Sequence, residues 1–270
     1  MSITLEKSKK YIQQIIKEKP DFGILLLESQ FNKLIEEVEN PICISYEEIP
    51  IFHEKNLYGK FLFGKIEGKN IVFLIEPSFE ENRENSILLC KKIGIEKLIL
   101  INISAGINPN YKMGDIMLVK DHINFFPENF NVKKIMKNNL FKINELYDQK
   151  MLDIAENIAM THNIIIQKGI YVAFPYPNYK TYAENSMIRS IGGDCVGINI
   201  LTDVLIARCI NLRVFSITII FMGLISDCKS QDKNTGSIIT NNFLLNTFTE
   251  TEKSMRLLIL IIKEFIKFCL

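Results

Sequence analysis

The feature that most constrains the fold of this chain is the alternation of two apolar patterns along its length. Continuous apolar runs of strand length occur at residues 23–27, 60–66, 70–76, 97–103, 115–119, 170–174 and 213–221. Apolar residues at helical spacing occur at residues 8–19, 86–94, 148–163, 182–192 and 201–211. Unbroken apolar runs are typical of strands covered on both faces. The alternation therefore predicts a layered α/β fold around a parallel or mixed sheet.

Length and charge narrow the class of protein further. The chain has 270 residues, of which 47% are hydrophobic, and no linker or internal repeat interrupts the pattern. This predicts a single domain over residues 1–270 with a sizeable core. Lys and Arg together (32) nearly balance Asp and Glu (31). Because no net field would draw the protein to nucleic acid, we expect no nucleic-acid partner.

The cysteines and the first residues indicate a cytoplasmic protein. The six cysteines are widely spaced and form no Cys-x-x-Cys motif, so we expect reduced, mostly buried thiols at Cys43, Cys90, Cys195, Cys209, Cys228 and Cys269. The opening MSITLEKSKK contains charges throughout and lacks the apolar core of a secretory signal.

Two segments stand apart from the alternation. Residues 255–270 are the most apolar stretch, but they are too short to span a bilayer and carry Lys263, Glu264 and Lys267. We interpret them as a helix packed on the core or on a partner, with a membrane-surface helix as the alternative. Residues 126–141 mix Asn, Lys and Phe without a period, which predicts a long loop that serves as a lid or contact surface.

One stretch carries a family resemblance. Residues 102–125, NISAGINPNYKMGDIMLVKDHINF, resemble the trimeric purine nucleoside phosphorylases, in which an Asn-Ala-Ala-Gly-Gly-Leu-Asn-Pro turn leads through Gly-Asp-Ile-Met into Asp-His-Ile-Asn. Other segments resemble further family motifs in the same order, at residues 20–34, 46–52, 146–151, 169–184 and 196–219. The resemblance implies a three-layer α/β/α fold around a central mixed, partly barrel-like sheet.

The resemblance also implies an activity and an assembly. Family members perform phosphorolysis, in which phosphate attacks the anomeric carbon of a purine nucleoside and yields free base and ribose 1-phosphate. The reaction uses no cofactor and no metal, and we expect no metal site at the lone His53 and His162. The family usually forms homotrimers. The implied partners are therefore other copies of this chain or, if that contact has changed, a protein in a hetero-assembly, with a purine nucleoside or phosphate as ligand.

The positions that resemble the family's phosphate site have changed. The glycine-rich phosphate loop corresponds to residues 28–33, ESQFNK, in which Ser29 matches the phosphate serine but Glu28 would repel an anion and Phe31 would obstruct the backbone. The family's next phosphate segment, with an Arg and a His, corresponds to the acidic residues 75–85. Arg83 is the single cation there, and we interpret it as a solvated loop residue.

The central turn and the sugar site have changed as well. The paired alanines of the central turn, whose amides face the ligand, correspond to Ile103 and Ser104. The Met-Ser pair that seats ribose and phosphate corresponds to Ile198 and Asn199, where Asn199 could still bind phosphate.

On the base side, the substitutions alter the hydrogen-bonding groups. The glutamate that reads the purine corresponds to Lys180, which can donate but not accept. The preceding phenylalanine corresponds to Tyr179, which could still stack on a base or could be a core aromatic. The asparagine that bonds N7 of the base corresponds to Met222, and the histidine at the sugar corresponds to Gly236. His122, Tyr171 and Arg208 match the family, and we interpret these three as structural.

We therefore predict a family member that keeps the framework and has lost phosphorolysis, serving as a structural or regulatory subunit of a larger assembly. One alternative is an active purine nucleoside phosphorylase with altered specificity, using Ser29, Asn199, Tyr179 and Lys180. A second alternative is a nucleoside or nucleotide sensor that binds its ligand without turning it over.

Overall fold

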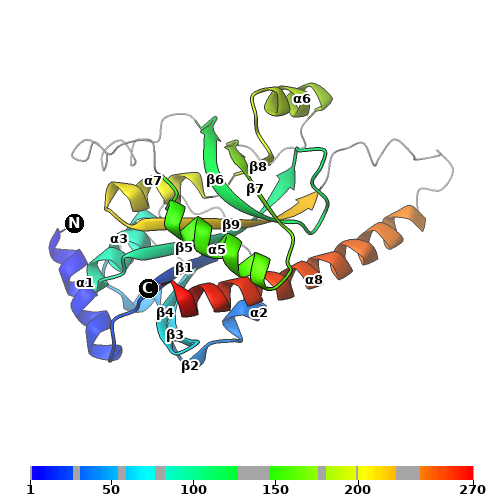
Figure 1. Ribbon diagram of the computed structural model, residues 1–270. Coiled ribbons are helices and arrows are strands. Elements are labelled where there is room, and N and C mark those ends of the chain that lie inside the picture. The colour runs from blue at the N-terminus through cyan, green and yellow to red at the C-terminus, as the bar shows by residue number, and fades with distance from the viewer. Residues whose placement is uncertain are drawn as a thin grey trace.

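The structure is a computed structural model that describes residues 2–26, 31–53, 59–76, 83–126, 146–175, 181–198, 200–222 and 238–269. The described residues form a nine-stranded mixed sheet with helices on both sides (Figure 1). The strands are β1 (Phe22–Leu26), β2 (Glu39–Ser45), β3 (Lys60–Ile66), β4 (Lys69–Ile75), β5 (Lys97–Gly106), β6 (Ile116–Asn124), β7 (Ile166–Ala173), β8 (Cys195–Gly197) and β9 (Arg213–Met222).

The helices occupy most of the connections between these strands. They are α1 (Ser2–Ile15), α2 (Asn32–Ile35), the 3₁₀ helix η2 (Tyr46–Glu48), α3 (Glu84–Ile93), α5 (Gln149–Thr161), α6 (Tyr182–Ser190), α7 (Leu201–Cys209) and α8 (Ile238–Phe268). Helix α3 contacts α1 and α7, whereas α5 packs against α8 (Figure 1).

The sheet closes on itself at one side. Its strand order is β2-β3-β4-β1-β5-β8-β7-β6-β9, and a further pairing of β9 with β5 completes a ring of the last five strands. Strand β1 lies between β4 and β5, parallel to both, and all five of its residues are buried. The predicted three-layer α/β/α arrangement with a mixed, partly barrel-like sheet is thus confirmed.

The apolar runs predicted the strands well where the strands are buried. The runs at 60–66 and 97–103 correspond to β3 and to the first seven residues of β5. Two strands were missed. Most residues of strand β2 are exposed, and the strand contains Pro41. Strand β8 has only three residues. Neither provides the apolar run from which a strand is recognised.

The C-terminal segment packs on the core, as one of the two interpretations predicted. Helix α8 begins at Ile238, well before the apolar residues that suggested it. Phe265 is fully buried and contacts the rings of Phe215 and Phe22, at centroid distances of 4.7 and 6.3 Å. Among the described residues, no helix is long and apolar enough to cross a membrane.

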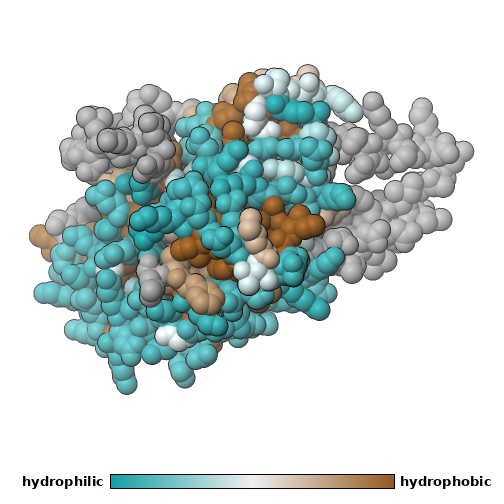
Figure 2. All heavy atoms as spheres, viewed as in Figure 1, coloured by the Kyte–Doolittle hydropathy of each residue, from teal (hydrophilic) through white to brown (hydrophobic). Residues whose placement is uncertain are grey.

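The thiols also follow the prediction over the described part of the chain. Cys90, Cys195, Cys209 and Cys269 are free and buried, and Cys43 on β2 is free and exposed. Cys228 lies outside the described residues. Most of the visible surface is hydrophilic, but apolar residues gather over α6 (Figure 2), where Met187 and Ile191 are 41% and 44% exposed.

We expect Phe265→Ala to lower the free energy of unfolding by about 3–5 kcal/mol, because the large cavity would lie between two rings that cannot collapse into it. Phe268→Ala is the matched control, since the Phe268 side chain is 57% exposed. Urea denaturation followed by circular dichroism measures both. Equal effects of the two substitutions would contradict the packing of α8 on β1 and β9.

Candidate functional site

The candidate site lies where the parallel strands end. Strands β1, β4 and β5 run in the same direction, and open α/β sheets bind ligands beyond the carboxyl ends of such strands. Leu26 ends β1, Glu76 follows β4, and Gly106 ends β5. The segment that carries Ser29, after β1, lies outside the described residues.

The pairing of β5 leaves a short open interval at this end. Strand β1 pairs with β5 up to Ile101, and β8 pairs with it only from Ala105. On that edge, Asn102, Ile103 and Ser104 pair with neither strand among the described residues. Backbone groups in this interval can therefore face a ligand. The role of the Ile103 and Ser104 amides stays a prediction.

Two further predicted positions, Met222 and Ile198, lie towards the same interval of β5. On the other edge of β5, Ile103 pairs with Ile219 of β9, and Ala105 pairs with Met222. Strand β8 runs antiparallel to the end of β5, which directs the half-buried Ile198 back towards Ile103. The structure thus places Ile103, Ser104 and the backbone of Met222 at neighbouring positions of β5 and β9, and the chain at Ile198 leaves β8 in their direction. Tyr179, Lys180, Asn199, Gly236 and residues 127–141 of the predicted loop lie outside the described residues.

The hydroxyl of Ser104 is buried and hydrogen-bonded within the protein interior. Its hydroxyl forms a hydrogen bond of 2.9 Å with the hydroxyl of Thr218, which in turn donates to the carbonyl oxygen of Asn102 at 3.1 Å. All three residues are buried. The Ser104 backbone, rather than its hydroxyl, is therefore the group that could serve a ligand.

A strained residue stands beside the undescribed Asn199. Ile200 has φ 73° and ψ −36°, a left-handed conformation that is a genuine outlier for a β-branched residue. Its side chain is buried, with 1% exposed. Such strain costs on the order of 1–3 kcal/mol and is found mainly at ligand sites. No feature of the local sequence signals it.

Phe31 does not project into the site. Its side chain is fully buried in the hydrophobic core, directly before α2. The expectation that Phe31 would obstruct the loop after β1 therefore needs correction, because the ring fills the core instead.

A buried carboxyl group follows β4, in the region that resembles a phosphate segment. Glu76 is 7% exposed and accepts a hydrogen bond from the hydroxyl of Tyr46. Burial raises the pKa of Glu76 to about 7, although Ser86, Tyr46 and the charge of Arg83 oppose the shift. Its second oxygen, Oε2, has no hydrogen-bond partner among the described residues. An anion entering here would meet a carboxyl group rather than a cation.

Arg83 is not the solvated loop residue that the sequence suggested. Its side chain is only 9% exposed and faces Asp203, which is 1% exposed. Arg83 Nε donates to Asp203 Oδ1 at 3.0 Å, and Nη2 lies 3.0 Å from Oδ2. The prediction was wrong because the buried partner lies 120 residues away. Asp203, the one acid on a largely apolar predicted helix, was the one available signal.

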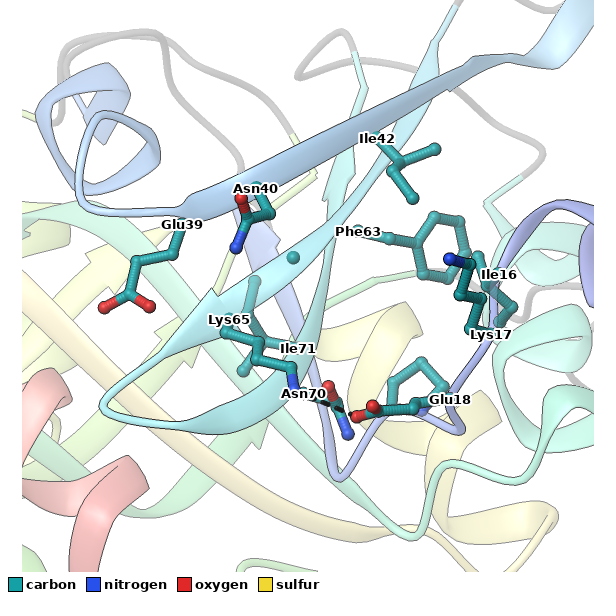
Figure 3. Close-up of a pocket in the computed structure, with 12 residues that line it drawn as sticks. Ile16, Lys17, Glu18, Glu39, Asn40, Ile42, Phe63, Lys65, Asn70 and Ile71 are labelled. Carbon is teal, nitrogen blue, oxygen red and sulfur yellow. Dashed lines mark ion pairs between the residues drawn. The ribbon is translucent and has the colours of Figure 1, made fainter.

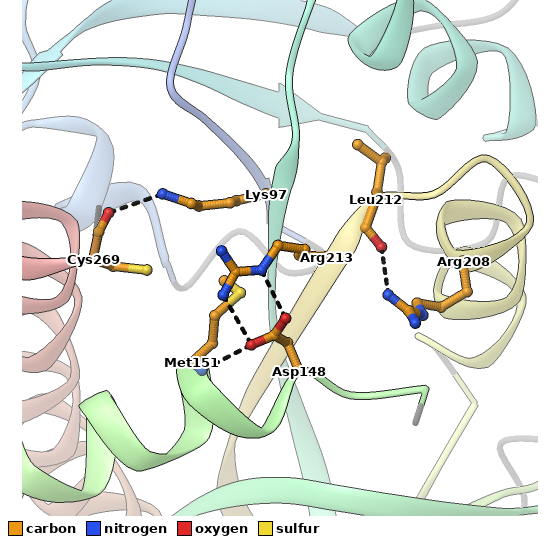
Figure 4. Close-up of polar contacts among 7 residues, drawn as sticks. All are labelled: Lys97, Asp148, Met151, Arg208, Leu212, Arg213 and Cys269. Carbon is orange, nitrogen blue, oxygen red and sulfur yellow. Dashed lines mark hydrogen bonds and ion pairs between the residues drawn. The ribbon is translucent and has the colours of Figure 1, made fainter. Parts of the chain in front are cut away.

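The matched family residues make structural contacts. His122 Nδ1 lies 3.1 Å from the hydroxyl of Tyr147, and burial lowers the pKa of His122. Tyr171 is fully buried and so close to Gly197 that a Cβ there would lie 2.1 Å from its hydroxyl. Arg208 donates to the carbonyl oxygen of Leu212 at 3.1 Å (Figure 4).

An ion pair joins the start of α5 to the first residue of strand β9. Arg213 donates to both carboxyl oxygens of Asp148, at 2.7 and 3.0 Å (Figure 4). Asp148 also caps α5 by accepting from the backbone N–H of Met151. Over the described ranges, no group of three or more His, Cys, Asp or Glu residues could hold a metal ion.

We expect Asp203→Asn to lower the free energy of unfolding by about 3–5 kcal/mol, because it removes the carboxylate charge that offsets the buried charge of Arg83. The double variant Arg83→Met with Asp203→Leu should recover most of this loss, since it removes both charges. The exposed pair of Arg256 and Glu252 is the control, and breaking it should cost less than about 1 kcal/mol. A similarly small cost at Asp203 would show that water screens the buried pair.

We expect neutral Glu76 to stabilise the fold in acid. The carboxyl group titrates at about pH 7 when folded and near 4.5 when unfolded, so its contribution is complete below pH 4.5 and is lost as the pH rises through 7. The loss is on the order of 3 kcal/mol, from about 1.4 kcal/mol per pKa unit. Urea denaturation of wild type and Glu76→Gln across this range measures it.

The outcome depends on the difference between the two proteins. The wild type should lose stability relative to Glu76→Gln as the pH rises from 4.5 to 7. Glu47→Gln makes the same chemical change at an exposed position and controls for general effects. Parallel curves for wild type and Glu76→Gln would contradict a proton held by the buried carboxyl group.

Comparison with known proteins identifies the family. A model of the phosphorylase superfamily matches residues 25–264. The chain is 32% identical over 232 residues to purine nucleoside phosphorylase 1 of Bacillus subtilis, covering 82% of this chain and 85% of that protein.

Solved structures agree with this match. A Schistosoma purine nucleoside phosphorylase in complex with hypoxanthine superposes with a TM-score of 0.79 at 22% identity, over 98% of this chain and 97% of that one. Isoform 2 from Schistosoma mansoni, in complex with cytosine and ribose-1-phosphate, gives a TM-score of 0.79 at 26% identity, over 98% and 96%. The chain belongs to the phosphorylase superfamily and, within it, to the purine nucleoside phosphorylase family.

Proposed function

We propose that this protein has lost phosphorolysis and acts, as one domain over the whole chain, in a structural or regulatory role within a larger cytoplasmic assembly. The observation that carries the proposal is the state of Arg83. It is the single cation between residues 75 and 85, and it is buried against Asp203. The segment after β4 thus offers phosphate a buried carboxyl group, Glu76, and no available positive charge.

The base side supports the same proposal. Met222 stands where the resemblance places the asparagine that bonds N7 of the leaving base, and a methionine has no donor for that nitrogen. Loss of one preorganised donor typically costs about a hundred to a thousand-fold in rate. Lys180 inverts the hydrogen-bonding character at the other edge of the base, and Gly236 removes the imidazole at the sugar.

An assembly role is supported by the surface. The resemblance implies a homotrimer, yet residues 126–141 lack the family's Arg-Phe-Gly-Asp-Arg-Phe contact segment. The exposed Met187 on α6 and Ile191 directly after it add apolar area that a partner would cover. We therefore propose a modified homotrimer or a hetero-assembly.

Strain at Ile200 favours a second candidate, a site that still binds a nucleoside or phosphate. A left-handed isoleucine beside Asn199 persists only when its surroundings hold it there. Under this candidate Ser29, Ile103, Tyr179, Lys180 and Asn199 line the site, either for altered catalysis or for sensing without turnover.

The test of the proposal is product formation. Incubated with inosine or guanosine plus phosphate, the purified protein should release no free base above the buffer control, as measured by liquid chromatography, because the phosphate site lacks a cation. The Bacillus subtilis relative assayed in parallel is the positive control. Base release that Ser29→Ala abolishes would overturn the proposal.

A thermal-shift measurement separates the candidates. A ligand at a hundred times its dissociation constant adds about 2.7 kcal/mol to stability. The proposed loss of the site predicts no shift with phosphate, inosine or guanosine. A shift without product formation would support the sensor, and a shift with product formation would support the active enzyme.

A further inference from the structure

A pocket lies at the edge of the sheet, away from the candidate site. It has a volume of about 270 Å³ and opens between β2, β3 and the segment that leads from α1 to β1 (Figure 3). Its apolar lining comes from Ile16, Pro20, Ile42, Phe63 and Ile71. This volume holds one large apolar side chain with room to spare, since a dry cavity of about 150 Å³ holds benzene.

Local backbone features create this pocket. Helix α1 ends at Ile15, and Ile16 and Pro20, which follow it, line the pocket in an extended segment. The pairing of β2 with β3 shifts register between Glu39 and Ile42, where Asn40 has φ 51°. Gly64 allows the close approach of β2, because a Cβ there would lie 2.2 Å from Val38 Cγ1. The bulge and the helix end together leave apolar surface uncovered.

The pocket adjoins an open strand edge. Strand β2 is the first in the sheet order, and over the described residues it pairs only with β3. Its residues 39–43 are exposed, and Ile42 is 40% exposed. Ile42 pairs with Phe63, so both side chains lie on the face that carries the pocket. An unpaired edge beside an apolar pocket is the arrangement used to bind an added strand.

The pocket is separate from the family site. Pro20 precedes β1, and Asn70 lies at the start of β4. The candidate site lies beyond the opposite, carboxyl ends of these parallel strands. Occupation of the pocket would therefore neither fill nor require the nucleoside site.

Charges at the pocket define the chemistry of an occupant. Glu18 is already paired with Lys65 at 3.1 Å. Lys17 and Glu39 lie towards opposite sides of the pocket (Figure 3), and neither has an ion-pair partner within the described part of the chain. An acidic group near Lys17 and a basic group near Glu39 would complement both.

We propose that the edge of β2 binds an extended segment of a partner protein, which pairs antiparallel with the outward-facing N–H and C=O of Cys43 and places one bulky apolar side chain in the pocket. The Ser45 N–H is not available for this pairing, because it donates to Glu48 Oε1 at 2.8 Å. Antiparallel pairing is the more stable of the two geometries, and Pro41 offers no N–H for pairing before Ile42. The segment carries an acidic residue towards its N-terminus and a basic residue towards its C-terminus. The inference rests on the proposed assembly role, for which it supplies a contact.

A second copy of this chain fits less well. Strand β2, with sequence ENPICIS, has no basic residue for Glu39 and no aromatic residue for the pocket. The chemistry of the surface thus favours a different protein.

The test uses the ¹⁵N-labelled full chain and the capped peptide Asp-Val-Phe-Val-Lys, whose Asp, Phe and Lys share one face when extended. In a titration to about 1 mM, a weak-binding range, amide signals of Cys43, Ile44 and Phe63 should shift. Replacing Phe by Ser, or reversing the charges as Lys-Val-Phe-Val-Asp, should weaken binding about tenfold, equivalent to about 1.4 kcal/mol. Ile42→Lys should do the same, whereas Ile165→Lys, at an 84% exposed position, should not.

Several outcomes would overturn this inference. One is that no amide signal of β2 or β3 shifts with the Phe peptide or with its Leu and Tyr analogues. Another is that the Ser peptide binds as tightly as the Phe peptide. A third is that β2 signals broaden as the protein concentration alone rises, which would indicate a second copy of the chain. The phosphorolysis assay on the same sample separates the two proposals. Base release would overturn only the lost activity, and absent peptide binding without base release would overturn only this contact.

Discussion

Strand β5 is the element on which both the sheet and the candidate site depend. It is ten residues long, whereas its neighbour β1 has five. Strand β9 follows β5 along nearly its whole length on one edge. On the other edge β1 stops at Ile101 and β8 begins at Ala105. This mismatch in length is what allows an open sheet to become a closed ring, because one strand takes part in both.

The same mismatch creates the site. Between the last residue of β5 that pairs with β1 and the first that pairs with β8, backbone N–H and C=O groups must form hydrogen bonds with side chains, water or a ligand. Asn102, Ile103 and Ser104 occupy this interval, and the hydroxyls of Ser104 and Thr218 bond inward. The framework therefore presents a backbone surface that depends on strand lengths and not on the identity of the side chains. This explains how residues 102–125 can remain family-like while other site positions change.

What the sequence predicted correctly are features that local patterns encode. Buried strands such as β1 and β3 appear as unbroken apolar runs, and α5 appears at helical spacing. Features that depend on residues far away in the sequence were not predicted. Arg83 stands in an acidic run whose sequence suggests exposure, but a carboxylate 120 residues later buries it. Strand β2 lies at an edge, where exposure removes the apolar pattern. The strain at Ile200 depends on packing around α7, which no local pattern reports.

Charge burial at the end of β4 links stability to the proposed loss of a phosphate site. A buried ion pair and a buried carboxyl group gain little over apolar packing, yet removing one member is costly. Once Arg83 and Asp203 bind each other in the interior, neither is available to a ligand without breaking the core between α3 and α7. The pocket at β2 carries no such constraint, since Ile42 and Lys17 are exposed. Substitutions at the proposed partner surface therefore cost little stability, whereas substitutions at the end of β4 disturb a buried ion pair of the fold.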